Sequence, residues 1–303
     1  MIREIERSQR IRNVKYDGYI NKMHTSCAQM NYPSRAQADS MELRHFENNK
    51  TKDTLMTQPK KDDSKSALVV SAHSADFVWR AGGAIAKHTQ AGYAVHIVCL
   101  SFGERGESAK LWRKGSMTEE IVKASRREEA MAAAEILGAT VEFFDMGDYP
   151  LRADKESLFR LADVYRRVQP HFVLTHSLKD PYNYDHPMAT HLAQEARIIA
   201  QAEGYKPGET IVGAPPVYCF EPHQPEQCDW KPDVLLDITD VWDKKYQAIQ
   251  CMAGQEHLWE YYTRVAHQRG VQAKRNVGIT SAKNIVYGEG YQSIFPRVTE
   301  DLA

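Results

Sequence analysis

From Ala67 onward, the 303-residue sequence alternates between short apolar runs and longer amphipathic segments. The first apolar run, at 67–72, reads ALVVSA, and a helical pattern follows over 77–91 and ends at Gly92. Such short runs predict buried strands, and strand–helix alternation at this spacing predicts βαβ units. We therefore expect an α/β fold, a Rossmann-like, doubly wound, mostly parallel sheet with helices on both faces. Further strands are expected at 94–100, 140–145, 171–175, 217–220 and 234–238, and further helices at 118–137, 155–168, 187–203 and 240–252.

The first 66 residues differ in composition from the rest of the chain. They are polar, rich in Asn, Gln, Ser, Lys and Asp, and the stretch 48–66 is typical of a solvated linker. We expect 1–66 to be a polar N-terminal extension and 67–303 to be a single α/β domain. Three interpretations of the extension stay open: a disordered segment, an over-long gene start with the true start at Met56, or an ordered arm that packs on a neighbouring subunit.

Charge and cysteine content exclude several classes of protein. The chain has 39 Lys and Arg against 40 Asp and Glu, a net charge of -1, which argues against a nucleic-acid binder but leaves room for a basic pocket that takes a small anion. Its five cysteines are odd in number and form no Cys-x-x-Cys, which favours a reducing cytoplasm over a disulfide framework. We expect no membrane partner, because no apolar run approaches the roughly 20 residues that span a bilayer.

Ionisable loops follow the expected strands. Ligands of parallel sheets bind beyond the carboxyl ends of the strands, so these loops are the place to look for a site. One polar loop would mean little, but five at one edge of the sheet predict a functional site. The loops are 73–76, 102–108, 145–150, 176–186 and 221–223.

Three of these loop residues form a possible metal-binding set. His73 and Asp76 lie three residues apart at a strand-to-helix turn, and His186 lies after the fourth strand. Two imidazoles and a carboxylate, with one position open for water, are typical of a catalytic zinc site. We therefore expect one Zn²⁺ per chain, or another divalent transition metal, with Asp185 orienting its neighbours. The alternative for each histidine is an ordinary hydrogen-bonded polar residue.

Other cofactor and nucleophile motifs are missing from the sequence. The turn after the first strand has no Gly-x-Gly-x-x-Gly, so a dinucleotide site is not expected there. The chain has no Gly-x-Ser-x-Gly elbow and no Walker A sequence, which argues against an α/β-hydrolase and a P-loop enzyme.

Two of the loops resemble the motifs of a known family. The string AHSAD at 72–76 resembles the Ala-His-Pro-Asp-Asp-Glu motif of the LmbE-like (PIG-L) zinc deacetylases, and DH at 185–186 resembles their second motif, His-x-Asp-His. GERGE at 103–107 is similar to their Gly-Glu loop, and the likeness covers about 67–270. The resemblance implies an LmbE-like fold. It also implies three zinc ligands: His73, Asp76 and His186.

One position departs from the family motif in a way that matters for the chemistry. The family's general base is the first Asp of the Asp-Asp pair, and here that position is Ala75; Asn183 replaces the leading His of the second motif. Amide hydrolysis needs a base to activate water, so deacetylation by the usual route is not expected. The strings SAHSADFVWRAGGA, SFGERGES, DMGDYPL and DPYNYDHP instead resemble the 4-oxalmesaconate hydratase branch of the family, which has lost the same base and acts in bacterial breakdown of gallate and protocatechuate.

This resemblance implies a zinc-dependent hydro-lyase that acts on a small anionic keto-tricarboxylate, in a protein that forms a homo-oligomer. Glu107, Glu104 and His223 are the candidate acid/base residues, with Glu107 favoured. Two alternatives stay open: an LmbE-like N-deacetylase or amidase with a non-standard base, and a metal-binding protein without catalysis. The candidate substrate-binding residues are Arg80, Arg105, Arg152, Lys179, Asp148 and Tyr184.

Overall fold

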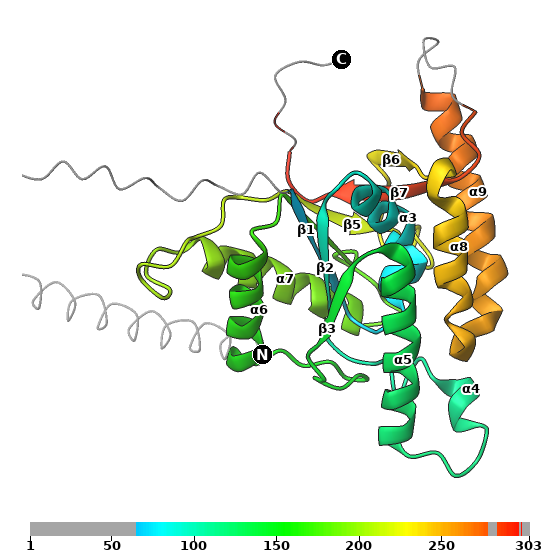
Figure 1. The fold of residues 1–303 in the computed structure, drawn as a ribbon, viewed down its shortest axis with the longest axis horizontal. Helices are drawn as coiled ribbons and strands as arrows, with labels where there is room; N and C mark the ends of the chain where they lie inside the picture. Colours follow the sequence, from blue (N-terminus) through cyan, green and yellow to red (C-terminus); the bar gives the residue numbers. More distant parts are fainter. Residues whose placement is uncertain (1–64, 278–283, 297, 299–303) are drawn as a thin grey trace, which may run out of the picture. The chain divides into compact units, whose positions relative to one another are not determined.

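A seven-stranded sheet lies at the centre of the computed structural model (Figure 1), which describes residues 65–277, 284–296 and 298. The strand order is β3-β2-β1-β4-β5-β7-β6; β1 to β5 run parallel, and β7 is antiparallel to both of its neighbours. The strands are β1 (Ser66–Ser71), β2 (Ala94–Cys99), β3 (Thr140–Phe143), β4 (Phe172–Thr175), β5 (Val217–Phe220), β6 (Val234–Asp237) and β7 (Gly288–Ser293). The expected mostly parallel α/β sheet is confirmed. The predictions for the N-terminal extension concern residues up to position 64, which lie outside the described residues.

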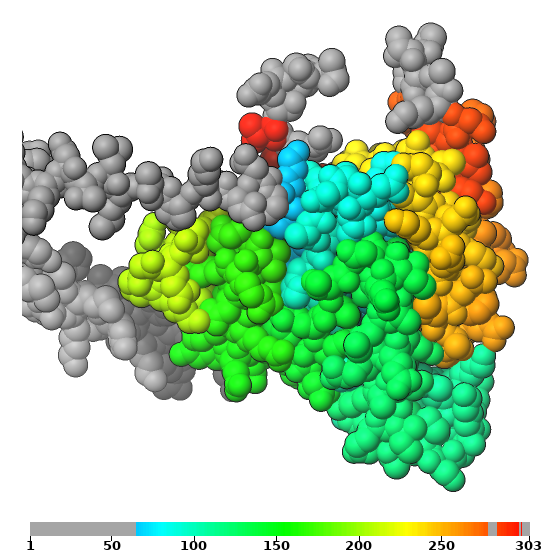
Figure 2. Space-filling model, in the orientation of Figure 1, coloured from blue at the N-terminus to red at the C-terminus, as the bar shows by residue number. Residues whose placement is uncertain are grey.

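Helices cover both faces of the sheet. On one face α6 and α7 pack together against β1, and on the other face lie α3, α5, α8 and α9. In the space-filling view, the green segment of α6 and the yellow and orange segments of α8 and α9 lie on opposite sides (Figure 2). The helices are α3 (Asp76–Gln90), α4 (Ala109–Trp112), α5 (Glu119–Leu137), α6 (Lys155–Val168), α7 (Asp185–Gln201), α8 (Trp242–Gln250) and α9 (Trp259–Asn276), with 3₁₀ turns η2 (Thr239–Val241) and η3 (Ala253–Leu258). Of the helices in the described ranges, none is both long enough and apolar enough to cross a bilayer.

Local sequence signals account for the helix ends in the parallel part. The Thr118 hydroxyl accepts the backbone N–H of Ile121, and Gly138 ends α5 with a φ of 78°. A capping side chain at the start and a left-handed glycine at the end are what the sequence predicted for this helix. The structure also contains elements that the sequence did not predict, α4, α9 and the antiparallel strand β7. Strand β7 reads GEGYQS, which has no apolar run to identify it.

A buried carboxylate ties β7 to α3. Glu289 is 4% exposed and accepts the backbone N–H groups of Gly83 and Ala84, both at 2.7 Å. It also accepts Lys245 Nζ at 2.7 Å and the Tyr291 hydroxyl at 2.6 Å. Burying an ionised carboxylate is unfavourable unless its oxygens are hydrogen-bonded and its charge is paired, and all of these donors meet that need. The contact brings β7 close to the backbone of α3.

Replacing Gly83 with alanine should destabilise the protein. A Cβ at this position would lie 2.7 Å from two carbons of Ile238 and 2.8 Å from Glu289 Oε1. We expect Gly83→Ala to lower the free energy of unfolding by about 1–3 kcal/mol, the usual range for overpacking, as measured by urea denaturation. Gly82→Ala is the matched control, because its Cβ meets only the Lys245 side chain, at 3.3 Å, and its effect should be close to zero. Equal losses in both variants would contradict this account of Gly83.

Candidate metal centre and active site

A single cavity of about 170 Å³ receives a side chain from the loop after each parallel strand. The five expected polar loops therefore do meet at one edge of the sheet, as the rule for parallel sheets predicts. The residues that they contribute are Asp76 after β1, Glu107 after β2, Tyr149 after β3, His186 after β4 and His223 after β5.

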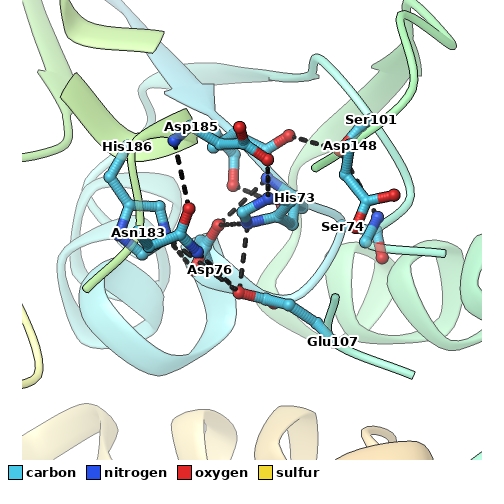
Figure 3. Close-up of polar contacts among 12 residues, drawn as sticks. His73, Ser74, Asp76, Ser101, Glu107, Asp148, Asn183, Asp185 and His186 are labelled. Atoms are coloured by element: carbon cyan, nitrogen blue, oxygen red, sulfur yellow. Dashed lines mark hydrogen bonds and ion pairs between the residues drawn. The ribbon is translucent and has the colours of Figure 1, made fainter. Parts of the chain in front are cut away.

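Four of the described side chains converge closely enough to hold a metal ion. They are His73, Asp76, Glu107 and His186, and their candidate ligand atoms all lie within 4.8 Å of one another. His73 Nδ1 is 3.0 Å from Asp76 Oδ2 and 3.2 Å from Glu107 Oε1 (Figure 3). His186 Nε2 is 3.6 Å from Asp76 Oδ1 and 4.0 Å from Glu107 Oε1. The structure thus brings the three predicted ligands together and adds Glu107 to the group.

Both imidazoles are oriented by a carboxylate on the nitrogen that faces away from the cluster. His73 Nε2 is 3.2 Å from Asp185 Oδ2, and His186 Nδ1 is 2.8 Å from Asp180 Oδ2. His186 Nε2 is buried and has no hydrogen-bond partner among the described residues. Histidines that bind a metal ordinarily donate their second ring N–H to a carboxylate in this way. The donor set therefore fits a divalent transition metal, whose bonds to such ligands are about 2.0–2.2 Å.

Charges around the cluster shift the titration of His73 and Asp76. Burial alone would lower the pKa of His73, but Glu107, Asp185 and Asp76 outweigh burial and raise that pKa well above 6.5. Burial would raise the pKa of Asp76, but His176, His186 and His73 hold it well below 3.8. Asp76 is therefore ionised, and an ion bound at His73 must displace a proton, so that binding is coupled to proton release.

The first motif is held by hydrogen bonds at the start of α3. The His73 backbone N–H donates to Asp76 Oδ2 at 3.0 Å, and the Ser71 hydroxyl donates to the His73 carbonyl at 2.7 Å. Asp76 is the first residue of α3, where the helix dipole favours a negative charge. Ser74 donates to the Phe102 carbonyl at 2.8 Å and so links this turn to the loop after β2.

Asp148 lies behind the loop that carries Glu107. Its carboxylate is fully buried and accepts the backbone N–H of Arg105 at 2.9 Å and that of Gly106 at 2.7 Å. Asp148, predicted to bind substrate, thus positions the Glu107 loop. Asn183 reaches the same carboxylate from the other side, since its Nδ2 donates to Glu107 Oε1 at 3.4 Å.

The two candidate glutamates occupy different environments. Glu107 lines the cavity, and its Oε2 is buried with no hydrogen-bond partner among the described residues. Glu104 lies outside the residues that line this cavity; its Oε2 accepts the Phe102 N–H at 3.1 Å and its Oε1 is 3.7 Å from Lys123 Nζ. Burial raises the pKa of Glu104. The arrangement favours Glu107 for chemistry beside the metal cluster.

Arg80 is the predicted substrate-binding residue that reaches the cavity. It is 7% exposed, its Nη1 donates to the Glu221 carbonyl at 3.0 Å, and its Nε lies 3.4 Å from Asp76 Oδ1. The guanidinium is thus held beside the metal cluster by a neighbouring backbone carbonyl.

The remaining predicted substrate-binding residues lie elsewhere. Arg105 Nη2 is 3.3 Å from Glu119, and Lys179 Nζ is 2.5 Å from Asp229, so both cations pair with acids away from the cavity. Arg152 and Tyr184 line an adjacent, more open hollow that shares Tyr149, Tyr182 and Asn183 with the first cavity.

His223, from the loop after β5, is fixed by two tyrosines of α9. Its Nδ1 lies 3.1 Å from the Tyr262 hydroxyl, and its carbonyl accepts the Tyr261 hydroxyl at 2.6 Å. Burial, with help from the Arg80 charge, lowers the pKa of His223 to about 4. The imidazole is therefore neutral at neutral pH, with one nitrogen engaged by Tyr262.

Sequence reasoning missed two groups of site residues. Asp180 lies in the polar loop 176–186 but was not predicted as a site residue, although a carboxylate in the loop that carries a candidate histidine ligand was a usable signal. Leu258 of η3 and Tyr262 of α9 also line the cavity. They are distant in sequence from every strand end, so the rule that directs attention to strand ends could not identify them.

Removing either histidine of the cluster should remove the metal. We expect His73→Ala and His186→Ala to lose bound metal and activity, because each deletes one of few donors, and elemental analysis of dialysed protein measures the loss. His223→Ala is the matched control, since this histidine lines the cavity outside the four-residue cluster and the variant should keep its metal. Near-normal metal content in both cluster variants would refute the ligand assignment.

Comparison with known proteins agrees with this geometry. The PIG-L family model, described as GlcNAc-PI de-N-acetylase, matches residues 68–197. A 4-oxalmesaconate hydratase of Pseudomonas putida KT2440 is 86% identical over 239 residues, which are 79% of this chain and 93% of that protein. The crystal structure of GalB, the 4-carboxy-2-hydroxymuconate hydratase from Pseudomonas putida KT2440, has a TM-score of 0.78 and 86% identity, and the match covers 79% of this chain and 100% of that one.

More distant relatives share the fold. The N,N'-diacetylchitobiose deacetylase from Pyrococcus horikoshii has a TM-score of 0.62 at 22% identity, and the match covers 87% of this chain and 94% of that one. This likeness shows a common fold, and the family assignment rests on the family model and the 86% identical relative. The chain belongs to the PIG-L (LmbE-like) family.

Proposed function

We propose that the protein is a metal-dependent hydro-lyase that adds water to the carbon–carbon double bond of 4-oxalmesaconate and forms 4-carboxy-4-hydroxy-2-oxoadipate. The observation that carries this proposal is the 86% identity to the Pseudomonas putida hydratase across 93% of that protein. The name of the second relative fits the same substrate, because 4-carboxy-2-hydroxymuconate is the enol tautomer of 4-oxalmesaconate. The reaction belongs to bacterial breakdown of gallate and protocatechuate.

Zinc is the metal that the donor set favours. Two imidazoles and a carboxylate from His73, Asp76 and His186 suit Zn²⁺, as in other sites with a position left open for water or substrate. Bound there, zinc would supply Lewis acidity, lowering the pKa of water and polarising an oxygen of the substrate. Asp185 and Asp180 would then keep the two imidazoles in the orientation that binding requires.

Glu107 is the residue best placed to move a proton. Hydration requires one proton to leave water and another to reach carbon, and Glu107 offers a buried oxygen without a hydrogen-bond partner among the described residues, beside the cluster. Burial would raise the pKa of Glu107, but the charge and hydrogen bond of His73, with the charge of His186, lower it, so the carboxylate is ionised. The neutral imidazole of His223 is the second candidate and Glu104, which is held behind the loop, is the third.

Arg80 is the proposed clamp for an anionic group of the substrate. It supplies the only guanidinium among the described residues that line the cavity. Addition of water to a bond conjugated with a carbonyl builds negative charge in the substrate, and a fixed cation in a cavity that excludes water stabilises such charge. Arginine also suits carboxylates, because its two donors match their two oxygens.

Arg152 and Tyr184, which line the adjacent hollow, are proposed to contact the substrate as it enters the cavity. Because Arg105, Lys179 and Asp148 make contacts outside the cavity, they contribute by holding the surrounding loops.

Assembly and location complete the proposal. The family resemblance supports a homo-oligomer, and a degradative enzyme for a small anion suits the bacterial cytoplasm. In the described part of the chain, Cys99, Cys219, Cys228 and Cys251 are free thiols, which fits a reducing compartment.

A direct assay tests the function. Purified metal-loaded protein incubated with 4-oxalmesaconate should remove the ultraviolet absorbance of the conjugated substrate, and prior treatment with a chelator should abolish the reaction until metal is restored. A parallel incubation with N-acetylglucosamine derivatives, followed by acetate release, is the comparison arm. Strong deacetylation without loss of 4-oxalmesaconate would refute the proposal, and binding of metal without either reaction would favour a non-catalytic metal protein.

The variant Glu107→Gln should show whether this glutamate transfers a proton or binds the metal. We expect Glu107→Gln to retain its metal and to lower kcat by about two to four orders of magnitude, the usual contribution of a general acid or base. Glu104→Gln tests the third candidate in the same assay, and because its carboxylate lies outside the cavity, kcat should fall far less than in Glu107→Gln. A tenfold loss or less in Glu107→Gln would reduce this glutamate to a loop residue, and loss of metal would make it a ligand.

A further inference from the structure

Trp79 lines the cavity, and its indole carries a buried polar group that the proposed chemistry does not use. Trp79 is 2% exposed and lines the cavity, and its Nε1 is buried with no hydrogen-bond partner among the described residues. A buried tryptophan N–H ordinarily finds an acceptor, because an unsatisfied donor in a low-dielectric interior is unfavourable. We infer that the Trp79 N–H is a hydrogen-bond donor to a carboxylate of the bound substrate, which makes Trp79 a specificity-determining residue.

The helix places this donor beside the charged groups of the site. Asp76, Trp79 and Arg80 stand at positions i, i+3 and i+4 at the start of α3, so their side chains project from one side of the helix. All three line the cavity, and Arg80 Nε is a second buried nitrogen that makes no hydrogen bond to the described residues, although it lies 3.4 Å from Asp76 Oδ1 as an ion pair. One turn of helix thus offers a metal-cluster carboxylate followed by two adjacent N–H donors.

The ring is held rigidly by its neighbour on α9. Trp79 stacks on Tyr262 with ring centroids 5.3 Å apart and planes 10° apart. The Tyr262 hydroxyl is already engaged with His223 Nδ1 at 3.1 Å. A fixed donor loses little conformational entropy when it meets an oxygen, so a rigid ring is suited to recognition.

The charges of the cavity explain why a neutral donor is useful there. The lining includes three acidic side chains, Asp76, Glu107 and Asp180, and one guanidinium, that of Arg80. A substrate with three carboxylates needs several donors, and an indole N–H provides one that is permanently protonated and uncharged. A buried donor of this kind also selects, because an analogue without the matching oxygen leaves the donor unsatisfied.

The variant Trp79→Phe tests the inference, which rests on the proposed function for the identity of the substrate. Phenylalanine keeps an aromatic ring against Tyr262 and removes the N–H. We expect KM for 4-oxalmesaconate to rise about tenfold or more, within the range for a lost hydrogen bond to a charged group, while kcat stays within about threefold. Metal content should be unchanged. The melting temperature should fall somewhat, because the smaller ring leaves a cavity in a buried site, so KM and the affinity for a bound anion are the readouts that decide.

A non-reactive probe separates binding from catalysis. Propane-1,2,3-tricarboxylate, titrated into the metal-loaded protein by calorimetry, should bind Trp79→Phe more weakly than the wild type by about the same factor as KM changes. Trp242→Phe is the matched control, since Trp242 stacks on Tyr287 at 4.1 Å, outside the residues that line the cavity, and both KM and the probe Kd should stay unchanged.

Each outcome decides between the two proposals. Unchanged KM and unchanged probe Kd in Trp79→Phe would overturn the role of Trp79 and leave the hydratase function intact. A lower melting temperature with unchanged affinities would likewise overturn it, in favour of a structural role. A probe that binds through Trp79 in a protein that fails to hydrate 4-oxalmesaconate would support the subsite and overturn the function. Absence of both binding and turnover in the wild type would overturn both.

Discussion

Two carboxylate–imidazole pairs determine the geometry of the site. Asp185 binds His73 Nε2 and Asp180 binds His186 Nδ1, so the remaining nitrogen of each ring faces Asp76. Both acids come from the segment after β4, and Asp185 is itself fixed by the backbone N–H groups of Tyr149 at 3.0 Å and Leu151 at 2.8 Å. A ligand from the loop after β1 is therefore oriented by the loops after β3 and β4. This dependence explains why a parallel sheet that brings these loops to one edge is the framework for the site.

The same pairs place several charges in a small buried volume. Buried carboxylates and imidazoles are tolerated only when each is paired or hydrogen-bonded, and a divalent cation at the centre would balance the remaining negative charge. The absence of a carboxylate at Ala75 fits this balance. Ala75 is fully buried and belongs to the larger apolar cluster, where the family motif has an aspartate. A carboxylate at this position would add one more buried negative charge next to Asp76, and burying such a charge is unfavourable.

Periodicity predicted the parallel part of the fold because each strand and helix there buries an apolar face. It failed for β7, because this strand has no apolar run: Glu289 is buried through an ionic and hydrogen-bonded network, and Tyr291 is its contribution to the apolar core. In the site, motif spacing and strand order were enough to bring His73, Asp76 and His186 together. They could not show which way the other loop side chains turn, because long-range hydrogen bonds decide it. Asp148 turns towards the backbone of Arg105, and Lys179 pairs with Asp229.

The cavity is lined by two sets of segments, the loops after the strands on one hand and η3 with α9 on the other. The loops after the strands supply the candidate metal ligands and Glu107, whereas η3 and α9 supply Gln255 and Tyr262. Tyr262 stacks on Trp79, and its hydroxyl lies 3.1 Å from His223 Nδ1. A deacetylase with 22% identity keeps the same fold, so the fold alone does not determine the reaction. Changes on η3 and α9 can alter which substrate is bound without disturbing the ligands, because the two sets of residues come from separate segments. Residues that select the substrate of this protein are therefore best sought on η3 and α9, away from Asp76 at the start of α3.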